Sequence, residues 1–317
     1  MIKKLVVVFL LLIAFIGCNE DVNLQAEYKE SVVLWSVLDN QSGEYKIYCY
    51  VTSEQNGNAV NNDANVAFMN LYQNSLLKKT AQTTEYDSVR RINRIVFKGG
   101  VAIYPGDTIR VEAILQSGKK VEGTTIIPNY TVLSYNFSTA NGYSPEIDSL
   151  GISRGYLGIS WESDKRYVVL PKLTFHYTYY DGVKEHDSVR VVPIVRRREN
   201  GVLINIYPNI TTQQNIEFDN TILNNVVNEI SIGEDSERWR YGIRYAVFEL
   251  LVMDENLSAY YGSVNGFLDS YSVRLDQNIY SNVKGGMGLV GSAIVQSETI
   301  RIDPNYIRSF GYRFIYF

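Results

Sequence analysis

The chain has 317 residues, of which 34 are acidic and 30 basic, and its formal net charge is −4. This balance offers no basic surface to a phosphate backbone, so we expect no nucleic-acid partner. Tyrosine is frequent, with 25 residues against 7 prolines and 4 methionines. Such a composition favours strands over helices, and the length exceeds that of most single domains, so we expect two domains.

The first residues read as an export signal. Two lysines precede an uninterrupted apolar run from Leu5 to Ile16, which is shorter than the roughly 20 residues of a membrane-crossing helix and fits the core of a signal peptide. The run ends at Gly17-Cys18, which resembles a lipobox, the bacterial signal for attaching diacylglycerol to a cysteine. We therefore expect residues 1–17 to be removed and Cys18 to be lipidated. The alternative is an ordinary secretory signal with an incidental cysteine.

Residues 18–30 read as a polar tether. Asn19, Glu20 and Asp21 follow the cysteine directly, and acidic residues at this place resemble the signal that sends Bacteroidota lipoproteins to the outer face of the outer membrane. Each buried acyl methylene contributes about 0.8 kcal/mol, so several acyl chains would anchor the protein without another hydrophobic segment. We expect a lipid anchor in the outer membrane, with the body on the cell surface or the periplasmic face. The alternative interpretation of the acidic residues is a solvated tether.

Residues 31–128 read as consecutive β-hairpins. Thr108–Leu115 alternates, with Ile109, Val111 and Ala113 on one face. Short strands with turn signals about every 8–12 residues predict an Ig-like β-sandwich that ends at Pro128. The expected strands are Val32–Leu38, Tyr45–Val51, Val66–Tyr72, Arg94–Lys98, Val101–Tyr104, Thr108–Leu115 and Lys120–Ile127.

Residues 129–317 predict a larger, mostly antiparallel β domain with two short helices. Apolar residues recur with the helical period in Thr221–Ile230 and Asp254–Leu268, and these segments are the expected helices. Arg196–Gly201 reads as a charged, solvated turn. The expected strands are Leu157–Trp161, Tyr167–Leu170, Leu173–Tyr180, Ser188–Val195, Val202–Tyr207, Trp239–Met253, Tyr271–Leu275 and Ser292–Ile302.

A glycine-rich motif stands near the end of the chain. Gly286–Gly291 spells G-x-G-x-x-G, but a dinucleotide site needs a helix directly after the motif, so that its amides meet the pyrophosphate. The following residues, Ser292–Ile302, read instead as a strand. We interpret the motif as a glycine-rich turn with positive φ angles and expect no nucleotide cofactor.

The two histidines are the strongest candidates for a metal site. His176 and His186 flank the Asp181-Gly182 hairpin turn, which would place them on paired strands. Zinc needs three or four ligands, and Glu185 and Asp187 offer further oxygens. Two solvent-facing histidines are the simpler interpretation, and we expect no metal.

Two acidic clusters, Trp161–Asp164 and Glu234–Glu237, place carboxylates beside aromatic residues. A glycosidase uses two carboxylates across an aromatic-lined cleft, but nothing in the sequence sets a distance between these. The lone Cys49 of the mature chain lies in an apolar strand, where cysteine is most often a small buried hydrophobe. We therefore expect no enzyme activity.

Several segments resemble a Bacteroidota family of outer-membrane lipoproteins of unknown function, often encoded beside TonB-dependent receptors. The resembling segments are Cys18–Asp21, Val32–Leu38, Tyr104–Val111, Ile126–Pro128 and Tyr280–Gly291. The last resembles the family's glycine-rich turn, although Met287 and Val290 depart from its usual leucine and aromatic residue. The resemblance implies an Ig-like N-terminal domain and an outer-membrane location, and it supplies no catalytic residue.

Together these features predict a non-enzymatic lipoprotein that binds a ligand, such as a glycan or peptide, or assists a TonB-dependent receptor in nutrient uptake. A structural or adhesive surface protein is the alternative binding class. A glycan hydrolase is the enzyme alternative, and it would require two carboxylates that converge in a cleft.

Overall fold

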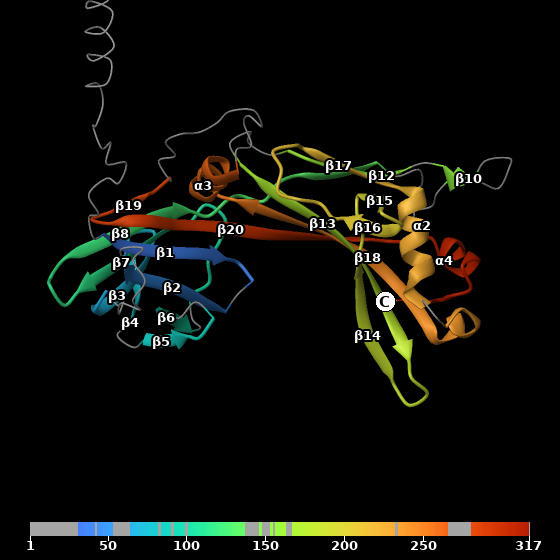
Figure 1. The fold of residues 1–317 in the computed structure, drawn as a ribbon, viewed down its shortest axis with the longest axis horizontal. Helices are drawn as coiled ribbons and strands as arrows, with labels where there is room; N and C mark the ends of the chain where they lie inside the picture. The colour runs from blue at the N-terminus through green and yellow to red at the C-terminus, as the bar shows by residue number, and fades with distance from the viewer. Residues whose placement is uncertain are drawn as a thin grey trace, which may run out of the picture.

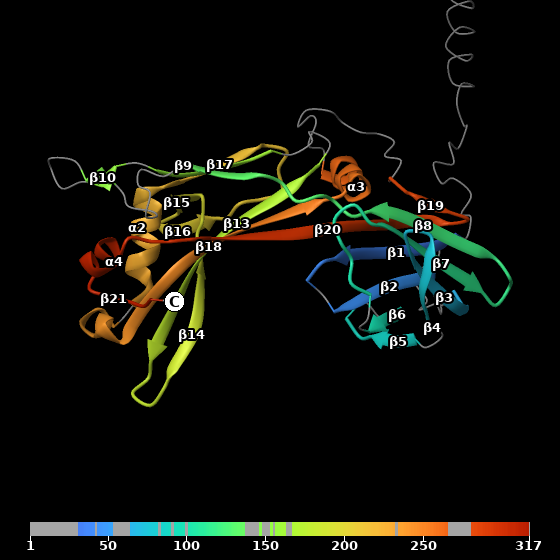
Figure 2. The same ribbon diagram turned by 180° about the vertical axis from the view of Figure 1, so that it is seen from behind.

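The computed structural model confirms a mainly β protein with a few short helices (Figures 1 and 2). None of the helices in the described part of the chain combines the length and the apolar character that crossing a bilayer requires. The structure describes residues 31–41, 43–52, 64–81, 84–89, 92–98, 101–136, 146–147, 153–154, 156–162, 167–231, 234–265 and 280–316.

The N-terminal lobe is a β-sandwich. One layer contains β1 (Val32–Asp39), β2 (Glu44–Val51), β6 (Ile92–Lys98) and β5 (Thr84–Asp87), all paired antiparallel in this order. The other layer is a five-stranded sheet of β19 (Val283–Lys284), β8 (Lys120–Ile126), β7 (Thr108–Leu115), β3 (Val66–Gln73) and β4 (Leu76–Ala81).

Alternation along the strands builds the core of this sandwich. Ile109, Val111 and Ala113 of β7 are fully buried, as the sequence predicted, and they pack in one cluster with Leu34 and Ile47 of the opposite layer. The removal of these apolar side chains from water is the main stabilising contribution to such a fold.

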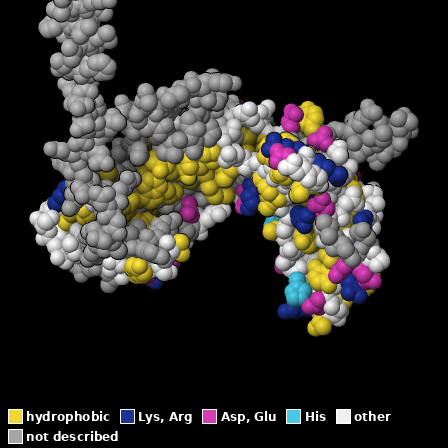
Figure 3. All heavy atoms as spheres, viewed as in Figure 1, with side chains coloured by type: hydrophobic (Ala, Val, Ile, Leu, Met, Phe, Trp, Pro, Cys, Tyr) yellow, Lys and Arg dark blue, Asp and Glu magenta, His cyan; other side chains and the backbone are white. Residues whose placement is uncertain are grey.

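The long strand β20 (Met287–Ile300) joins the two lobes (Figure 1). Residues 287–293 pair in parallel with β1 of the sandwich, and residues 293–300 pair antiparallel with β18 (Tyr241–Met253) of the C-terminal lobe. The sandwich layer is therefore continued into a nine-stranded sheet in the described part of the chain. In the space-filling view an open notch separates the lobes beneath this bridge (Figure 3).

The C-terminal lobe extends the same sheet and adds a second layer. β13 (Val169–Tyr180) pairs with β18 on one side and with β14 (Glu185–Val191) on the other, and β21 (Arg313–Phe314) also pairs with β18. The second layer is a three-stranded sheet in the order β17 (Asn215–Asp219), β12 (Tyr156–Trp161) and β9 (Leu133–Asn136). Two separate antiparallel strand pairs are β10 (Glu146–Ile147) with β11 (Ser153–Arg154), and β15 (Val195–Glu199) with β16 (Val202–Ile206).

The two predicted helices are present, and the described chain contains more helix than was predicted. They are α2 (Asn220–Asn228), which Asp219 caps by accepting a hydrogen bond from the Thr221 amide, and α3 (Glu255–Asn265). The structure adds α4 (Pro304–Ser309), with Asp303 as its N-cap, and the 3₁₀ turns Glu229–Ser231 and Asp235–Arg240.

Several local predictions were wrong. Val101–Tyr104 is irregular and not a strand. Arg196–Arg198 lie inside β15, because the turn of that hairpin is formed by Asn200 and Gly201, both at positive φ. The expected strands at Tyr167–Leu170 and Leu173–Tyr180 form the single strand β13, since Pro171 is accommodated within it. The expected strand Tyr271–Leu275 lies outside the described residues.

Candidate functional site

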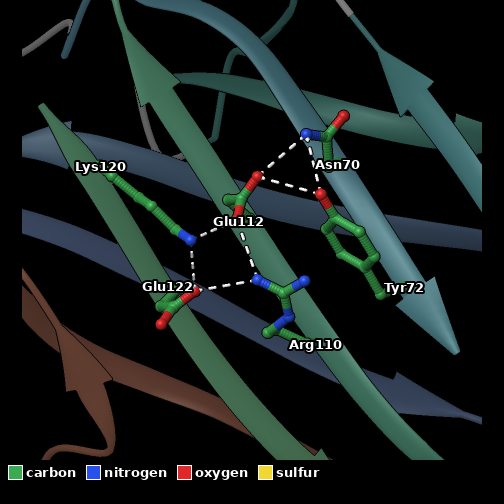
Figure 4. A network of polar contacts seen from close by, with 6 residues as sticks. All are labelled: Asn70, Tyr72, Arg110, Glu112, Lys120 and Glu122. Carbon is green, nitrogen blue, oxygen red and sulfur yellow. Dashed lines mark hydrogen bonds and ion pairs between the residues drawn. The ribbon is translucent and has the colours of Figure 1, made fainter. Parts of the chain in front are cut away.

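A polar network covers the outer face of the sandwich's five-stranded sheet (Figure 4). Glu112 is at its centre, because one of its oxygens accepts hydrogen bonds from Asn70 at 3.0 Å and Tyr72 at 3.2 Å. Its other oxygen contacts Arg110 at 2.9 Å and Lys120 at 2.6 Å. Arg110 also lies 3.8 Å from the centre of the Tyr72 ring, a cation–π contact. Glu122 completes the network by pairing with both cations at 3.0 Å.

This arrangement controls the ionisation of Glu112. Burial alone would raise the pKa of Glu112, but the hydrogen bonds from Lys120 and Asn70 and the charge of Lys120 lower it to about 2. The network therefore holds Glu112 as a carboxylate between two cations, and its four charged members are paired with one another. We interpret it as a structural feature of this sheet face.

Glu112 should make folding stability depend on pH. Its folded pKa of about 2 lies below the ordinary 4.5, so its contribution is complete above 4.5 and is lost as the pH falls toward 2. With solvent screening taken into account, we expect the wild type to lose about 1 kcal/mol more than Glu112→Gln between pH 6 and pH 3. Urea denaturation at both pH values measures this difference. Glu298→Gln, at an exposed strand position, is the control, and a Glu112→Gln protein with the wild-type pH dependence would contradict the assignment.

A second polar cluster joins the sandwich to the C-terminal lobe. Asp254, which is 2% exposed, accepts a hydrogen bond from the Thr125 hydroxyl of β8. Thr125 also contacts the Ser292 hydroxyl of β20 at 2.7 Å. The other Asp254 oxygen accepts the Leu257 amide at 2.8 Å and so caps the first turn of α3. The groups of this cluster come from β8, from β20 and from the start of α3, and Asp254 is buried among them. The cluster therefore connects the two lobes and does not open toward solvent.

The described residues also form a cavity of about 660 Å³ in the C-terminal lobe, a size typical of ligand sites. Pro171 of β13 lies on one side, and β17 lies on another. The loop between them is attached to β13, because Val169 and Thr211 exchange backbone hydrogen bonds of 2.9 and 2.8 Å. The lining residues are Pro171, Ile194, Val195, Pro208, Asn209, Ile210, Thr211, Gln213, Asn215, Ile216 and Glu217.

The chemistry of this lining is neutral and aliphatic. Apolar and polar atoms contribute to the lining in similar shares; the apolar residues are proline, isoleucine and valine, and the neutral polar groups are amides and a hydroxyl. Glu217 is the one charged side chain among the described lining residues, and it is exposed. The cavity therefore suits a ligand with aliphatic and amide-like groups, together with a neutral or positive charge.

The backbone of β17 borders the cavity as well. Asn215, Ile216 and Glu217 are consecutive strand residues that all line it. Side chains of consecutive strand residues point to opposite faces, so a space that contacts all three must face the edge of the strand. In the described structure β17 is the end strand of its sheet and pairs with β12 on its other side.

The structure places the two histidines on paired strands but not opposite one another. His176 of β13 is opposite Val189 and stacks on Tyr245, with 5.0 Å between ring centroids. His186 is opposite Tyr179 and contacts Asp181 at 2.6 Å.

The two acidic residues beside the histidines have other partners. Glu185 pairs with Arg313 at 2.9 Å, and Asp187 pairs with Arg244 at 2.8 Å. Across the described residues, no group of three or more His, Cys, Asp or Glu is placed to hold a metal ion.

The residues considered for hydrolysis have separate partners. Trp161 is 3% exposed and stacks on Phe248, so it forms part of the core and offers no sugar platform. Glu234 accepts a hydrogen bond from the Tyr241 hydroxyl at 2.8 Å, and Glu237 pairs with Arg240 at 2.8 Å. Ser163 and Asp164 lie outside the described residues.

The structure also describes two other features singled out in the sequence, Cys49 and the glycine-rich motif. Cys49 is buried in β2, which confirms its assignment as a small hydrophobe. The motif Gly286–Gly291 is mostly strand rather than turn, because β20 begins at Met287, although Gly285 and Gly288 do have positive φ angles. A strand follows the motif, so the geometry for dinucleotide binding is not formed there. Cys18 and residues 19–30 lie outside the described residues.

Comparison with known proteins identifies no family. No family model matches the chain, and no curated protein matches it. A solved structure with some likeness is the C-terminal globular domain of an oligosaccharyltransferase from Pyrococcus abyssi. The alignment has 10% identity and a TM-score of 0.21, and it covers 73% of this chain and 44% of that one. The chain thus spans less than half the length of this neighbour, and the likeness is too low to carry an argument.

The cavity was not predicted from the sequence. Its residues come from several segments between Pro171 and Glu217, and each segment alone reads as an ordinary loop or strand. The prolines Pro171 and Pro208 were a usable signal, because proline within or beside strands is typical of open sheet edges.

Proposed function

We propose that this protein is an exported lipoprotein, anchored in the outer membrane through Cys18, that binds a ligand without transforming it. The observation that carries the binding role is the cavity beside β17, with its aliphatic and amide lining. The lipobox-like Gly17-Cys18 and the apolar run before it support the anchor. Work alongside a TonB-dependent receptor in nutrient uptake is part of the same proposal and is supported by the sequence resemblance.

The anchor is tested by changing each cysteine in turn. We expect wild-type protein to incorporate a labelled fatty acid and to fractionate with the outer membrane. Cys18→Ala should lose both properties, because the thiol that carries the lipid is gone. Cys49→Ala is the matched control, since Cys49 is buried in β2, and it should stay lipidated. A Cys18→Ala protein that remains labelled and membrane-bound would exclude the anchor.

The location of the body and its partner need separate measurements. Protease added to intact cells should digest wild-type protein if the body is on the cell surface, whereas protection would place the body in the periplasm. Mild detergent extraction should then recover a TonB-dependent receptor with the wild-type protein. Recovery of the lipoprotein alone, under conditions that keep other outer-membrane complexes intact, would count against the receptor role.

A further inference from the structure

Among the described residues β17 has a strand partner on one side only, and, given the proposed binding role, its other edge indicates which class of ligand binds there. In an antiparallel sheet, alternate peptide groups of a strand point to each side. Since β17 pairs with β12 on one side, its other alternate N–H and C=O groups point toward the cavity that Asn215, Ile216 and Glu217 line. An extended chain placed there would satisfy these groups by strand addition, a common mode of peptide recognition.

The dimensions of the site fit a short extended segment. β17 has 5 residues, which at about 3.3 Å per residue gives an edge of roughly 17 Å. Pro171 and Pro208 lie in the lining and cannot donate backbone hydrogen bonds, so neither residue competes with β17 as a pairing edge. Ile216 is partly exposed and Val195 is 44% exposed, so both retain apolar surface that a ligand side chain would cover.

The lining also separates a peptide from a glycan. Sugar sites rely on aromatic platforms, whereas the described lining contains no Phe, Tyr or Trp. Aliphatic side chains of a peptide would contact the isoleucines and prolines, and a basic side chain would complement Glu217. We propose that the cavity binds an extended peptide segment of about five residues, with aliphatic side chains and a basic residue, as an added strand on β17.

The test uses the full chain purified in detergent and measures fluorescence polarisation. The probe is a labelled hexapeptide of alternating valine and lysine. Its comparison is the same peptide with every backbone nitrogen N-methylated, so that neither edge of the peptide can donate the strand hydrogen bonds. We expect saturable binding of the first peptide and at least roughly tenfold weaker binding of the second, since two lost hydrogen bonds correspond to about that ratio.

Two charge variants test the side-chain contact. Glu217→Lys reverses the charge at an exposed lining position and should weaken the lysine peptide by about fivefold to tenfold. Glu298→Lys makes the same change at an exposed position of β20 outside the cavity and should leave the affinity unchanged. Circular dichroism of both variants shows whether the fold is retained.

Several outcomes would overturn the inference. They are equal binding of the methylated peptide, equal binding by Glu217→Lys, binding of cellohexaose in place of the peptide, and no saturable binding of either peptide. The proposed function is tested by a different experiment, the fractionation of Cys18→Ala. A chain that is lipid-anchored and yet binds neither peptide would therefore remove this inference alone.

Discussion

Gly288→Ala is expected to destabilise the protein by about 3–5 kcal/mol, because a side chain at this position has no space and an unfavourable backbone. Gly288 has φ +120°, and a Cβ atom built on it would lie 2.2 Å from the carbonyl oxygen of Leu34. The two residues are partners in the parallel pairing of β20 with β1. Any side chain there would force apart the strands that join the lobes.

The matched control is another glycine in open surroundings. Gly262 lies in α3, and nothing is within 4 Å of the Cβ that alanine would add. Alanine is the better helix former, so Gly262→Ala should be neutral or stabilising by about 0.5–1 kcal/mol. Chemical denaturation of the two variants measures the contrast. Equal stability of both would show that β20 and β1 do not approach as closely as described.

This glycine illustrates what sequence could and could not predict. The interpretation of Gly286–Gly291 as a turn was wrong, since most of the motif is strand, but the expected positive φ is present at Gly288. Its structural use was missed, because the partner strand β1 lies about 250 residues earlier in the chain. Pairing over such a separation leaves no local pattern, and the same holds for the continuation of β20 beside β18.

Local patterns predicted well wherever burial alternates with the strand period. Thr108–Leu115 was predicted to the residue, because alternation marks a strand with one buried face. β4 (Leu76–Ala81) was missed, since Leu76 and Leu77 are both exposed and the strand shows no such alternation. The helix α4 had a usable signal that was overlooked, namely Asp303 as N-cap followed by Pro304 in the first turn.

Neither the polar network nor the cavity could be predicted from the sequence, because both depend on contacts between distant segments. The polar network on the sandwich contains Glu112, which lies on the face of β7 opposite its core residues, yet it is only 7% exposed and is bound by Asn70 and Lys120 of neighbouring strands. The cavity depends on residues as far apart in the chain as Pro171 and Glu217 lining one space. Both features arise from strand neighbours and loop placement, which the chain specifies only through the whole fold.

Asp254→Ala is expected to cost about 2–4 kcal/mol, because it removes a helix cap and leaves buried donors unsatisfied. The carboxylate accepts the Leu257 amide at 2.8 Å, the Asn256 side chain at 3.2 Å and the Thr125 hydroxyl. Thr125 is itself 1% exposed, so water cannot readily replace its partner. Denaturation curves give the loss, and hydrogen exchange should show faster exchange of the first amides of α3.

Asp254→Asn separates the role of shape from that of charge. Asparagine is an equally good cap, because its amide oxygen can still accept from the Leu257 amide. Its amide nitrogen would donate to the Thr125 hydroxyl oxygen in place of the present bond, so we expect Asp254→Asn to lose much less stability than Asp254→Ala. If both variants lose the same amount, the hydrogen bonds of Asp254 are not what holds α3 against the sandwich.

Comparing the wild type with Asp254→Asn should also reveal a dependence of folding stability on pH that is opposite in sign to that of Glu112. Burial raises the pKa of Asp254 above the ordinary 3.8, against the hydrogen bonds that lower it. The folded protein therefore holds this proton more tightly than the unfolded chain, and stability from this group falls as the pH rises from 3.8 through the folded pKa. Asp254→Asn has no such proton, so its stability should fall less than that of the wild type over this window. A wild type whose stability follows the Asn variant throughout would mean that Asp254 ionises in the folded state as easily as in water.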